Sequence, residues 1–270
     1  MTSFAARIGG HRLPTATPLR SHDDDTADVD ALLSTADGIR LVGLLARAVH
    51  DRAVVVDDST RARIDDLHLE QLAKSLRAER ALVDAVRVLR RAGIATRMLG
   101  GVALAHVDYS TPELRLFDFA TVLVSPGDRA RADEVVAHSD ELVLRSDLLD
   151  EAQLGIDAAD LFAPPTRFNL GALELEALPM PQRLLHVCAN VARRSTSPVP
   201  RLRDVAELVL RNRPHVAEVA IMARRWHAET SVARTIVATW RELAIELRPP
   251  IVDWAERITQ GDGDGVRSSE

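Results

Sequence analysis

The sequence predicts an α+β protein in which a small mixed sheet is flanked by an N-terminal helical pair and a C-terminal helical bundle. Three observations predict this fold. Apolar residues recur at helical spacing before residue 93, short apolar runs alternate with turns from 94 to 178, and helical spacing returns from Pro181 onward. We therefore expect four parts: a disordered arm at 1–30, N-terminal helices with a mixed core at 31–178, a helical domain at 179–258 and a flexible tail at 259–270.

The composition of the 270-residue chain predicts a globular cytoplasmic protein. Apolar residues make up 46% and charged residues 27%, which is ordinary for a soluble domain. The net charge of −6 argues against a nucleic-acid partner, which a basic patch would normally bind. No apolar run approaches the roughly 20 residues of a membrane span, and no signal peptide is recognisable. Lys74 is the only lysine among 34 basic residues, as is typical of a GC-rich bacterium, and Cys188 is alone, so no disulfide framework is expected.

Helices are expected at both ends of the chain. The segment 39–49 is apolar almost all round, which predicts a buried helix. The next helix is expected to begin at a cap formed by Asp58 or Ser59 and to end at Gly93. In the C-terminal part we expect helices from Pro181 to about 191, after Pro200, from Pro214 to about 226, from a Ser231 cap to about 247, and from Pro249-Pro250 through 254.

The segment between these helical regions has a mixed pattern. Strands are typical of its apolar runs, and turns of its Gly, Pro and Ser positions. In chain order we expect a strand at 94–99, a short helix at 102–107, a central strand at 116–124, a surface helix at 128–138, a strand at 141–145 and a long strand at 168–178.

The most informative stretch runs from Met98 to Val124, MLGGVALAHVDYSTPELRLFDFATVLV. A Gly100-Gly101 turn after a strand allows the backbone to approach a phosphate closely, and the following helix N-terminus favours anions. Equally, a tight strand-to-helix turn needs glycine for steric reasons alone. Arg115 has two interpretations as well, since it can contact a phosphate or cap the sheet.

This layout resembles the core of the nucleotidyltransferase superfamily, and most closely the uncharacterised bacterial nucleotidyltransferase family. In that family a strand ends in L-K-G, a helix and a Tyr-containing turn follow, then an Arg, and then the strand D-I-D-L-L-V. The segment from Leu99 to Arg115 keeps the family spacing without a gap. The same register places Gly100 on the lysine, Phe119 on the first aspartate and Thr121 on the second.

The resemblance implies nucleotidyl transfer from an NTP with Mg²⁺ as the metal, if the protein is active. Such transfer uses two divalent metals that hold the attacking and leaving oxygens, and the paired carboxylates of Asp-x-Asp bind them from one face of a strand. Phe119 offers no oxygen ligand, and the Thr121 hydroxyl is a weak one. Asp118 is adjacent to Phe119 in the sequence, but a one-residue step along a strand turns its side chain to the opposite face of the sheet. A β-bulge before Asp118 could rotate it back, but its partner on the same face would then be Ala120, which has no carboxylate.

Two further segments carry the resemblance. At 154–162, LGIDAADLF, the family has a third strand, and Asp157 falls on its third carboxylate; alternatively, Asp157 or Asp160 caps a helical turn. The segment RLRDVAEL at 201–208 resembles an L-R-D helix of the family. His186 and Asn190 lie one helical turn apart, and the family often has a histidine near the position of Asn190. We interpret the pair as satisfied polar residues of a helix face.

Three hypotheses follow for the function. The first is a nucleotidyltransferase-family pseudoenzyme that has lost metal-dependent transfer and binds a nucleotide, another small molecule or a protein partner, with Gly100, Gly101 and Arg115 as the nucleotide-binding candidates. The second is an active enzyme that moves an NMP onto a hydroxyl or phosphate acceptor, which requires Asp118 and Asp157 to converge as catalytic carboxylates. The third is a non-enzymatic helical interaction protein.

Overall fold

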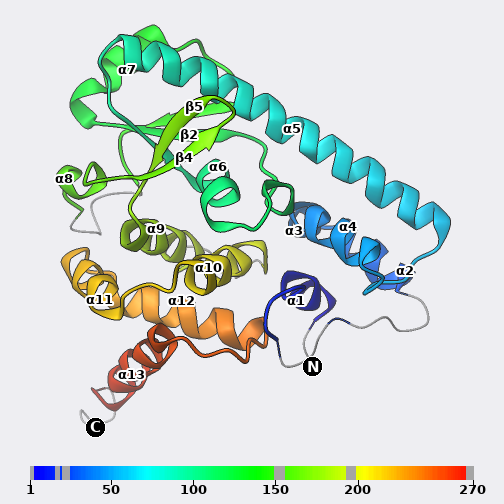
Figure 1. Ribbon diagram of the computed structural model, residues 1–270. Helices are drawn as coiled ribbons and strands as arrows, with labels where there is room; N and C mark the ends of the chain where they lie inside the picture. Colours follow the sequence, from blue (N-terminus) through cyan, green and yellow to red (C-terminus); the bar gives the residue numbers. More distant parts are fainter. Residues whose placement is uncertain (1–2, 16–18, 20–24, 149–155, 193–198, 266–270) are drawn as a thin grey trace.

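The computed structural model describes residues 3–15, 19, 25–148, 156–192 and 199–265. A five-stranded mixed sheet forms one layer, the long helix α5 (Asp58–Arg91) lies along it, and the C-terminal helices lie on the opposite side, beyond α6 (Gly100–Ala103) (Figure 1). The predicted α+β fold, with helices flanking a small mixed sheet, is confirmed. No helix among the described residues is both long enough and apolar enough to cross a membrane.

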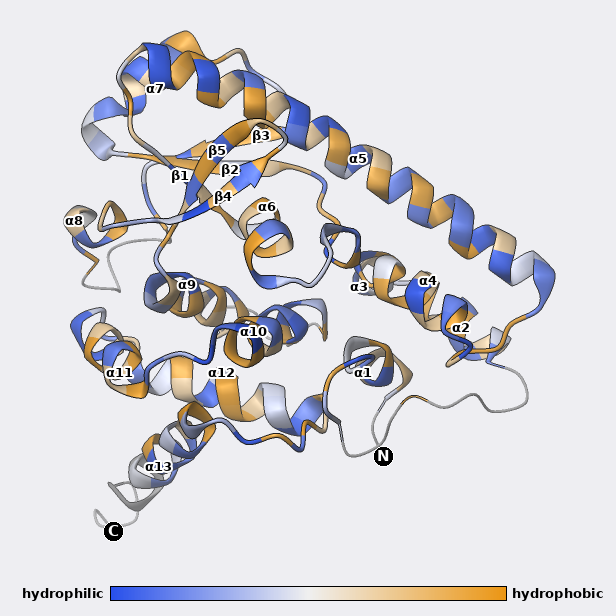
Figure 2. Cartoon of the chain, viewed as in Figure 1, coloured by the Kyte–Doolittle hydropathy of each residue, from blue (hydrophilic) through white to orange (hydrophobic). Residues whose placement is uncertain are grey.

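The N-terminal helices precede the sheet. They are α1 (Phe4–Gly9), α2 (Thr26–Leu33), α3 (Ala36–Arg40), α4 (Val42–His50) and α5. The α5 cap is Asp57, one residue before the predicted candidates, because its side chain accepts a hydrogen bond from the Thr60 amide at 2.7 Å. Figure 2 shows hydrophilic and hydrophobic residues alternating along α5, as expected of a helix with one face on a core and one in solvent.

The prediction of a disordered arm is wrong for the described residues before position 16. Residues 4–9 form α1, in which the Ile8 side chain is fully buried. The Arg203 guanidinium, from the C-terminal bundle, donates hydrogen bonds to the carbonyl oxygens of Gly9 at 2.7 Å and His11 at 2.6 Å. The polar composition of the arm concealed a short apolar segment that is ordered by contacts far along the chain. Residues 16–18 and 20–24 lie outside the described structure.

The sheet has the strand order β3-β2-β1-β5-β4. Its strands are β1 (Thr96–Leu99), β2 (Ala120–Val124), β3 (Leu142–Arg145), β4 (Thr166–Leu170) and β5 (Leu173–Ala177). The β1–β2 and β4–β5 pairs are antiparallel, whereas β2–β3 and β1–β5 are parallel. The single long strand expected at 168–178 is wrong, because Gly171, with φ of 58°, turns the chain into a β4–β5 hairpin.

Short helices connect the strands. They are α6, a π-helical turn η1 (Leu104–Asp108), two 3₁₀ turns η2 (Pro112–Leu114) and η3 (Pro126–Asp128), α7 (Arg129–Val135) and α8 (Ala158–Leu161). The third core strand expected at 154–162 is wrong where the structure describes it, since α8 occupies that segment; residues 154 and 155 lie outside the described structure. Asp157 lies just before α8 and caps it instead, as described below.

The C-terminal part is helical, as expected. Its helices are α9 (Met180–Ala192), α10 (Val199–Asn212), α11 (Val216–Arg225), α12 (Glu229–Glu242) and α13 (Pro250–Gly265). The Ser231 cap is wrong, because α12 already begins after Ala228. The flexible tail predicted from residue 259 is also wrong as far as Gly265, because buried apolar residues such as Ile251 anchor α13 on the bundle and an anchored helix extends readily.

Within the described residues, two hydrophobic clusters form the core. One lies between α5 and the sheet and includes Leu82, Val86, Met98 and Val122. The other joins the N-terminal helices α1–α4 to the C-terminal bundle. The N-terminal helices therefore pack on the same core as α9–α13, which holds the bundle against the sheet and creates the cleft described next.

Candidate functional site

A cleft of about 370 Å³ lies where the β1–α6 turn, the segment before β2 and the helices α9 and α10 meet. That volume lies within the usual range of small-molecule sites, about 300–1,000 Å³. Most of the residues singled out from the sequence line it. The lining residues are Ile39, Arg40, Gln71, Leu99, Gly100, Gly101, Arg115, Leu116, Phe117, Asp118, Phe119, Thr121, Arg145, Leu148, His186, Asn190, Pro200 and Arg201.

Glycine is favoured at both positions of the β1–α6 turn, for two different reasons. Gly100 has a φ of 59°, a left-handed conformation that side chains disfavour, although a Cβ there would meet no atom within 4 Å. A Cβ on Gly101 would lie 2.5 Å from the Cβ of Phe117, so close packing excludes any side chain. The steric interpretation of the turn therefore accounts for both glycines, and the backbone they leave bare faces the cleft.

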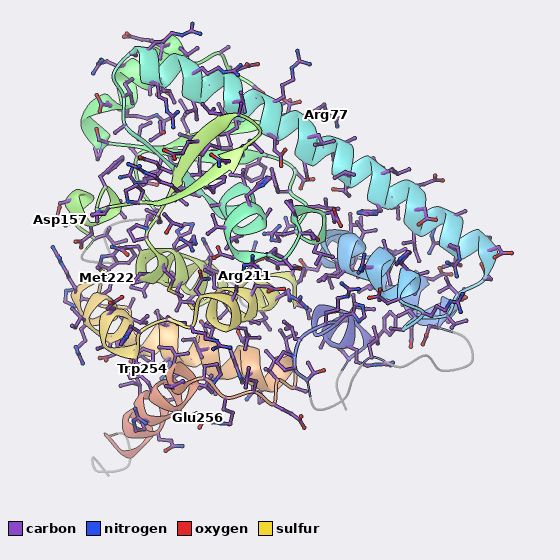
Figure 3. The ribbon with its side chains drawn as sticks, viewed as in Figure 1. Arg77, Asp157, Arg211, Met222, Trp254 and Glu256 are labelled. Atoms are coloured by element: carbon purple, nitrogen blue, oxygen red, sulfur yellow. The ribbon has the colours of Figure 1, made fainter. Side chains whose placement is uncertain are left out.

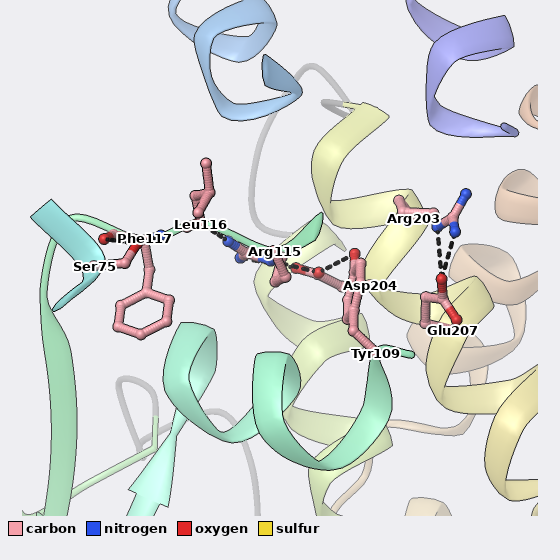
Figure 4. A network of polar contacts seen from close by, with 8 residues as sticks. All are labelled: Ser75, Tyr109, Arg115, Leu116, Phe117, Arg203, Asp204 and Glu207. Carbon is pink, nitrogen blue, oxygen red and sulfur yellow. Dashed lines mark hydrogen bonds and ion pairs between the residues drawn. The ribbon is translucent and has the colours of Figure 1, made fainter. Parts of the chain in front are cut away.

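Arg115 takes part in a buried ion pair with the C-terminal bundle. Its Nε and Nη2 donate to the two carboxylate oxygens of Asp204 at 2.6 and 3.0 Å, and its Nη1 donates to the Leu116 carbonyl at 2.7 Å (Figure 4). The Tyr109 hydroxyl donates to the same carboxylate at 2.8 Å. Burial alone would lower the pKa of Arg115, but the Asp204 carboxylate outweighs it and raises that pKa above its ordinary value. Arg115 thus joins the sheet to α10.

A second buried ion pair holds the same two parts together. Arg183 of α9 donates from Nε and Nη2 to the Asp108 carboxylate, both at 2.8 Å, and Asn212 of α10 donates to it at 2.9 Å. The Asp108 side chain is fully buried and that of Arg183 is 3% exposed. Because buried ion pairs require defined geometry, the two pairs fix the cleft walls relative to each other.

Asp118, Phe119 and Thr121 all line the cleft. The expectation that Asp118 faces away from Thr121 is wrong, because β2 begins only at Ala120 and strand alternation does not extend to residue 118. Asp118 is exposed, and the Gln71 amide, turned so that its nitrogen faces the carboxylate, donates to Oδ1 at 3.2 Å. The residue Phe119 is 48% exposed and presents an aromatic ring at this point.

Asp157 lies elsewhere. Its Oδ1 accepts a hydrogen bond from the Ala159 amide at 2.9 Å at the start of α8, which is the capping interpretation. Its other carboxylate oxygen lies 3.9 Å from Nη2 of Arg225 on α11. Figure 3 shows Asp157 at the periphery of the molecule, and it is not a cleft-lining residue. The structure therefore does not bring Asp157 together with Asp118.

The charges that line the cleft are mostly positive. Its described lining residues include four arginines (Arg40, Arg115, Arg145 and Arg201) but a single carboxylate, Asp118. Arg115 is neutralised by Asp204, as described above. Arg145 binds Asp147 from Nε at 3.0 Å, an exposed pair of the kind that contributes little and exchanges readily with other anions. The cleft is therefore suited to an anionic ligand.

His186 and Asn190 contribute a polar pair on α9 that the sequence interpretation undervalued. The Asn190 amide lies 3.1 Å from His186 Nε2, in agreement with a satisfied helix face. The Nδ1 atom of His186, however, is buried without a hydrogen-bond partner among the described residues. Burial first, and the Arg145 charge second, lower the pKa of His186 to about 4, so the imidazole is neutral at pH 7. Two signals in the sequence pointed to this pair: the helical His-x-x-x-Asn spacing, and the resemblance to a family that often has a histidine near the position of Asn190.

The described residues do not fit a pair of magnesium ions. Magnesium favours hard oxygen ligands, with one or two carboxylates plus phosphate oxygens. Asp118 is the only carboxylate that lines the cleft in the described part of the chain, and Phe119 offers no ligand atom. Within the described residues no group of three or more His, Cys, Asp or Glu side chains is placed to hold a metal ion.

Comparison with known proteins bears on this geometry. Residues 25–140 match the model of a family described as uncharacterised nucleotidyltransferase, which confirms the resemblance predicted for this part of the chain. The match includes the glycine turn, Arg115 and Asp118, whereas His186 and Asp204 lie beyond it. No curated protein and no solved structure is significantly similar to the chain.

Proposed function

Because residues 25–140 carry the uncharacterised nucleotidyltransferase family match, we propose that this chain is a member of that family that has lost metal-dependent transfer and binds a nucleotide in the cleft. One observation carries the proposal. The positions that the family's register assigns to the paired aspartates hold Phe119 and Thr121, and both line a cleft that is rich in arginine. The frame of the site is kept while its metal ligands are replaced.

The chemistry of transfer explains why this replacement matters. Displacing pyrophosphate requires charge neutralisation at both the attacking and the leaving oxygen, which two metal ions normally supply. A single carboxylate, Asp118, does not provide ligands for two such ions. Arginines can bind phosphate oxygens without a metal, since the guanidinium presents paired donors that match phosphate geometry. The site therefore supports binding better than catalysis.

Calorimetric titration with the four NTPs, with and without Mg²⁺, tests the proposal. We expect at least one NTP to bind and to raise the melting temperature, by a stabilisation of about 2.7 kcal/mol at 100 times its dissociation constant. We expect no pyrophosphate release in the same samples. Magnesium-dependent pyrophosphate release would overturn the proposed loss of transfer, and absence of binding by all four NTPs would overturn the nucleotide as ligand.

One observation favours a second function, active nucleotidyl transfer. Contrary to the sequence expectation, Asp118 lines the cleft and is exposed, so one carboxylate is available beside the glycine turn. If the wild-type protein releases pyrophosphate, Asp118→Asn should abolish that release while leaving the folded structure intact. Release that persists in Asp118→Asn would show that this carboxylate is not the metal ligand.

A further inference from the structure

His186 combines three properties that are rarely found together. Its side chain lines the cleft, only 8% of the residue is exposed, and one ring nitrogen has no partner among the described residues. Leaving a buried polar atom without a hydrogen bond is unfavourable, and most buried polar atoms in native proteins have a partner in the protein or in ordered water. The unsatisfied atom therefore marks a position where a ligand atom would be stabilised.

The hydrogen bond to Asn190 decides what His186 can offer. The Asn190 amide nitrogen is a donor, so His186 Nε2, 3.1 Å away, must be the acceptor. In a neutral imidazole the proton then resides on Nδ1, which makes the unsatisfied atom a donor. An acceptor oxygen is consequently the partner that this position fits.

The charged groups around His186 determine which acceptor fits best. Arg145 lies close enough to disfavour a positive charge on the imidazole. No acidic side chain hydrogen-bonds to His186 among the described residues, and an anionic oxygen would satisfy Nδ1 and Arg145 together. The charged residues that line the cleft from the other elements are Arg40 of α3, Arg115 and Asp118 before β2, Arg145 of β3 and Arg201 of α10.

We propose that His186 and Asn190 of α9, together with Arg145 of β3, form a subsite that binds a phosphoryl group without a divalent cation. His186 Nδ1 donates to a phosphoryl oxygen, and the Arg145 guanidinium exchanges Asp147 for the same group. The inference rests on the proposed binding function and specifies how the cleft recognises its ligand. These three residues lie outside residues 25–140, which the family model matches.

A measurable consequence follows from the charge of the ligand. In the free protein His186 is neutral at pH 7, because its pKa is about 4. A phosphoryl anion beside the ring favours the imidazolium and so raises that pKa toward neutrality. The added proton lies on Nε2, so the Asn190 amide must turn to present its oxygen as the acceptor. Binding should therefore be accompanied by proton uptake at pH 6 to 7, and no other histidine lines the cleft in the described chain.

The test is titration calorimetry of the full chain with inorganic tripolyphosphate, ATP and adenosine, in EDTA and in Mg²⁺. We expect tripolyphosphate and ATP to bind in EDTA and adenosine to bind weakly or not at all. Two variants separate the roles of the imidazole atoms. His186→Gln keeps a group near Nε2 for Asn190 but loses Nδ1, and should weaken phosphate binding by about 10- to 100-fold. His186→Asn keeps a donor near Nδ1 and should retain most of the affinity.

Repeating the titrations in buffers of different ionisation enthalpy measures the protons taken up. Wild-type protein should take up more protons on binding than His186→Asn does. Because the variant lacks the imidazole, its proton uptake measures the titration of the phosphate itself. Tripolyphosphate affinity unchanged in His186→Gln, equal proton uptake in the two proteins, or binding that requires Mg²⁺ would each overturn the subsite.

The outcomes distinguish this inference from the proposed function. If ATP binds but neither variant changes its affinity, the cleft binds nucleotides and the subsite is wrong. If tripolyphosphate binds through His186 but no NTP binds more tightly, the subsite holds and the nucleotide is the wrong ligand. If the variants lower only the melting temperature, another part of the chain satisfies His186 and the subsite is again wrong.

Discussion

Asp204→Asn is the most decisive perturbation of the architecture that forms the cleft. The Asp204 carboxylate accepts hydrogen bonds from Arg115 Nε, Arg115 Nη2 and the Tyr109 hydroxyl, and only 4% of its side chain is exposed. The substitution removes the negative charge and places an amide donor against the guanidinium. Breaking a buried ion pair by removing one partner costs about 3–5 kcal/mol, because the other charge stays buried and uncompensated.

The structure places the expected loss near the lower end of that range. The Arg115 side chain is 19% exposed and keeps its bond to the Leu116 carbonyl, so water and the backbone offset part of the loss. We therefore expect the free energy of unfolding to fall by about 3 kcal/mol, a large fraction of the 5–15 kcal/mol typical of a native protein.

Urea unfolding followed by circular dichroism measures the effect. The midpoint should fall in Asp204→Asn with little change in slope, which indicates lost stability and not a different unfolded state. Asp147→Asn is the matched control, since it breaks the exposed pair with Arg145 and should cost less than about 1 kcal/mol. Adding Arg115→Met to Asp204→Asn should recover part of the loss. A loss below about 1 kcal/mol in Asp204→Asn, or strict additivity in the double variant, would refute the reasoning.

Three further predictions concern the cleft itself. Gly101→Ala should destabilise the protein by about 1–3 kcal/mol in urea unfolding, because its Cβ would lie 2.5 Å from Phe117; an unchanged midpoint contradicts this. His186 has a folded-state pKa of about 4 against an ordinary 6.5, so between these pH values the unfolded chain binds a proton that the folded chain does not. Its contribution to the free energy of unfolding is therefore complete above pH 6.5 and falls by up to about 3 kcal/mol toward pH 4. Unfolding midpoints of the wild type and His186→Gln should diverge over that window, and parallel profiles contradict it. The double variant Phe119→Asp, Thr121→Asp should bind Mg²⁺ with a heat that calorimetry detects. If its binding heat does not exceed that of the wild type, the register that places these two residues on the family's aspartates is wrong.

Much of the fold could be predicted from the sequence. Helical spacing located α5 and the C-terminal bundle, and the apolar run before Pro126 located β2, because each pattern reports which face of its own element is buried. The glycine turn and the spacing from Leu99 to Arg115 identified the family frame, which the match over residues 25–140 confirms. These features depend on residues that are close in the sequence, so a short stretch of sequence is enough to recognise each of them.

The errors arose where neighbours distant in sequence decide the structure. The end of the α1 segment is held by hydrogen bonds from Arg203, about 190 residues away, and no local pattern in a polar arm predicts that contact. The hairpin at Gly171 was missed because a glycine between apolar residues is also compatible with a continuous strand. Asp157 was aligned with a third carboxylate, but the segment formed the short helix α8, where an aspartate is favoured as a cap.

The sequence by itself determined which chemical groups are available: glycines at the turn, an aromatic ring at Phe119 and a hydroxyl at Thr121, which the proposed register sets against the family's aspartates. Only the tertiary structure decided how those residues are used. It paired Arg115 with Asp204, turned Asp118 into the cleft and left His186 Nδ1 without a hydrogen-bond partner in the described part of the chain. The physical reason is that chemical identity belongs to each residue, whereas charge compensation and burial depend on contacts that form only when distant elements pack together.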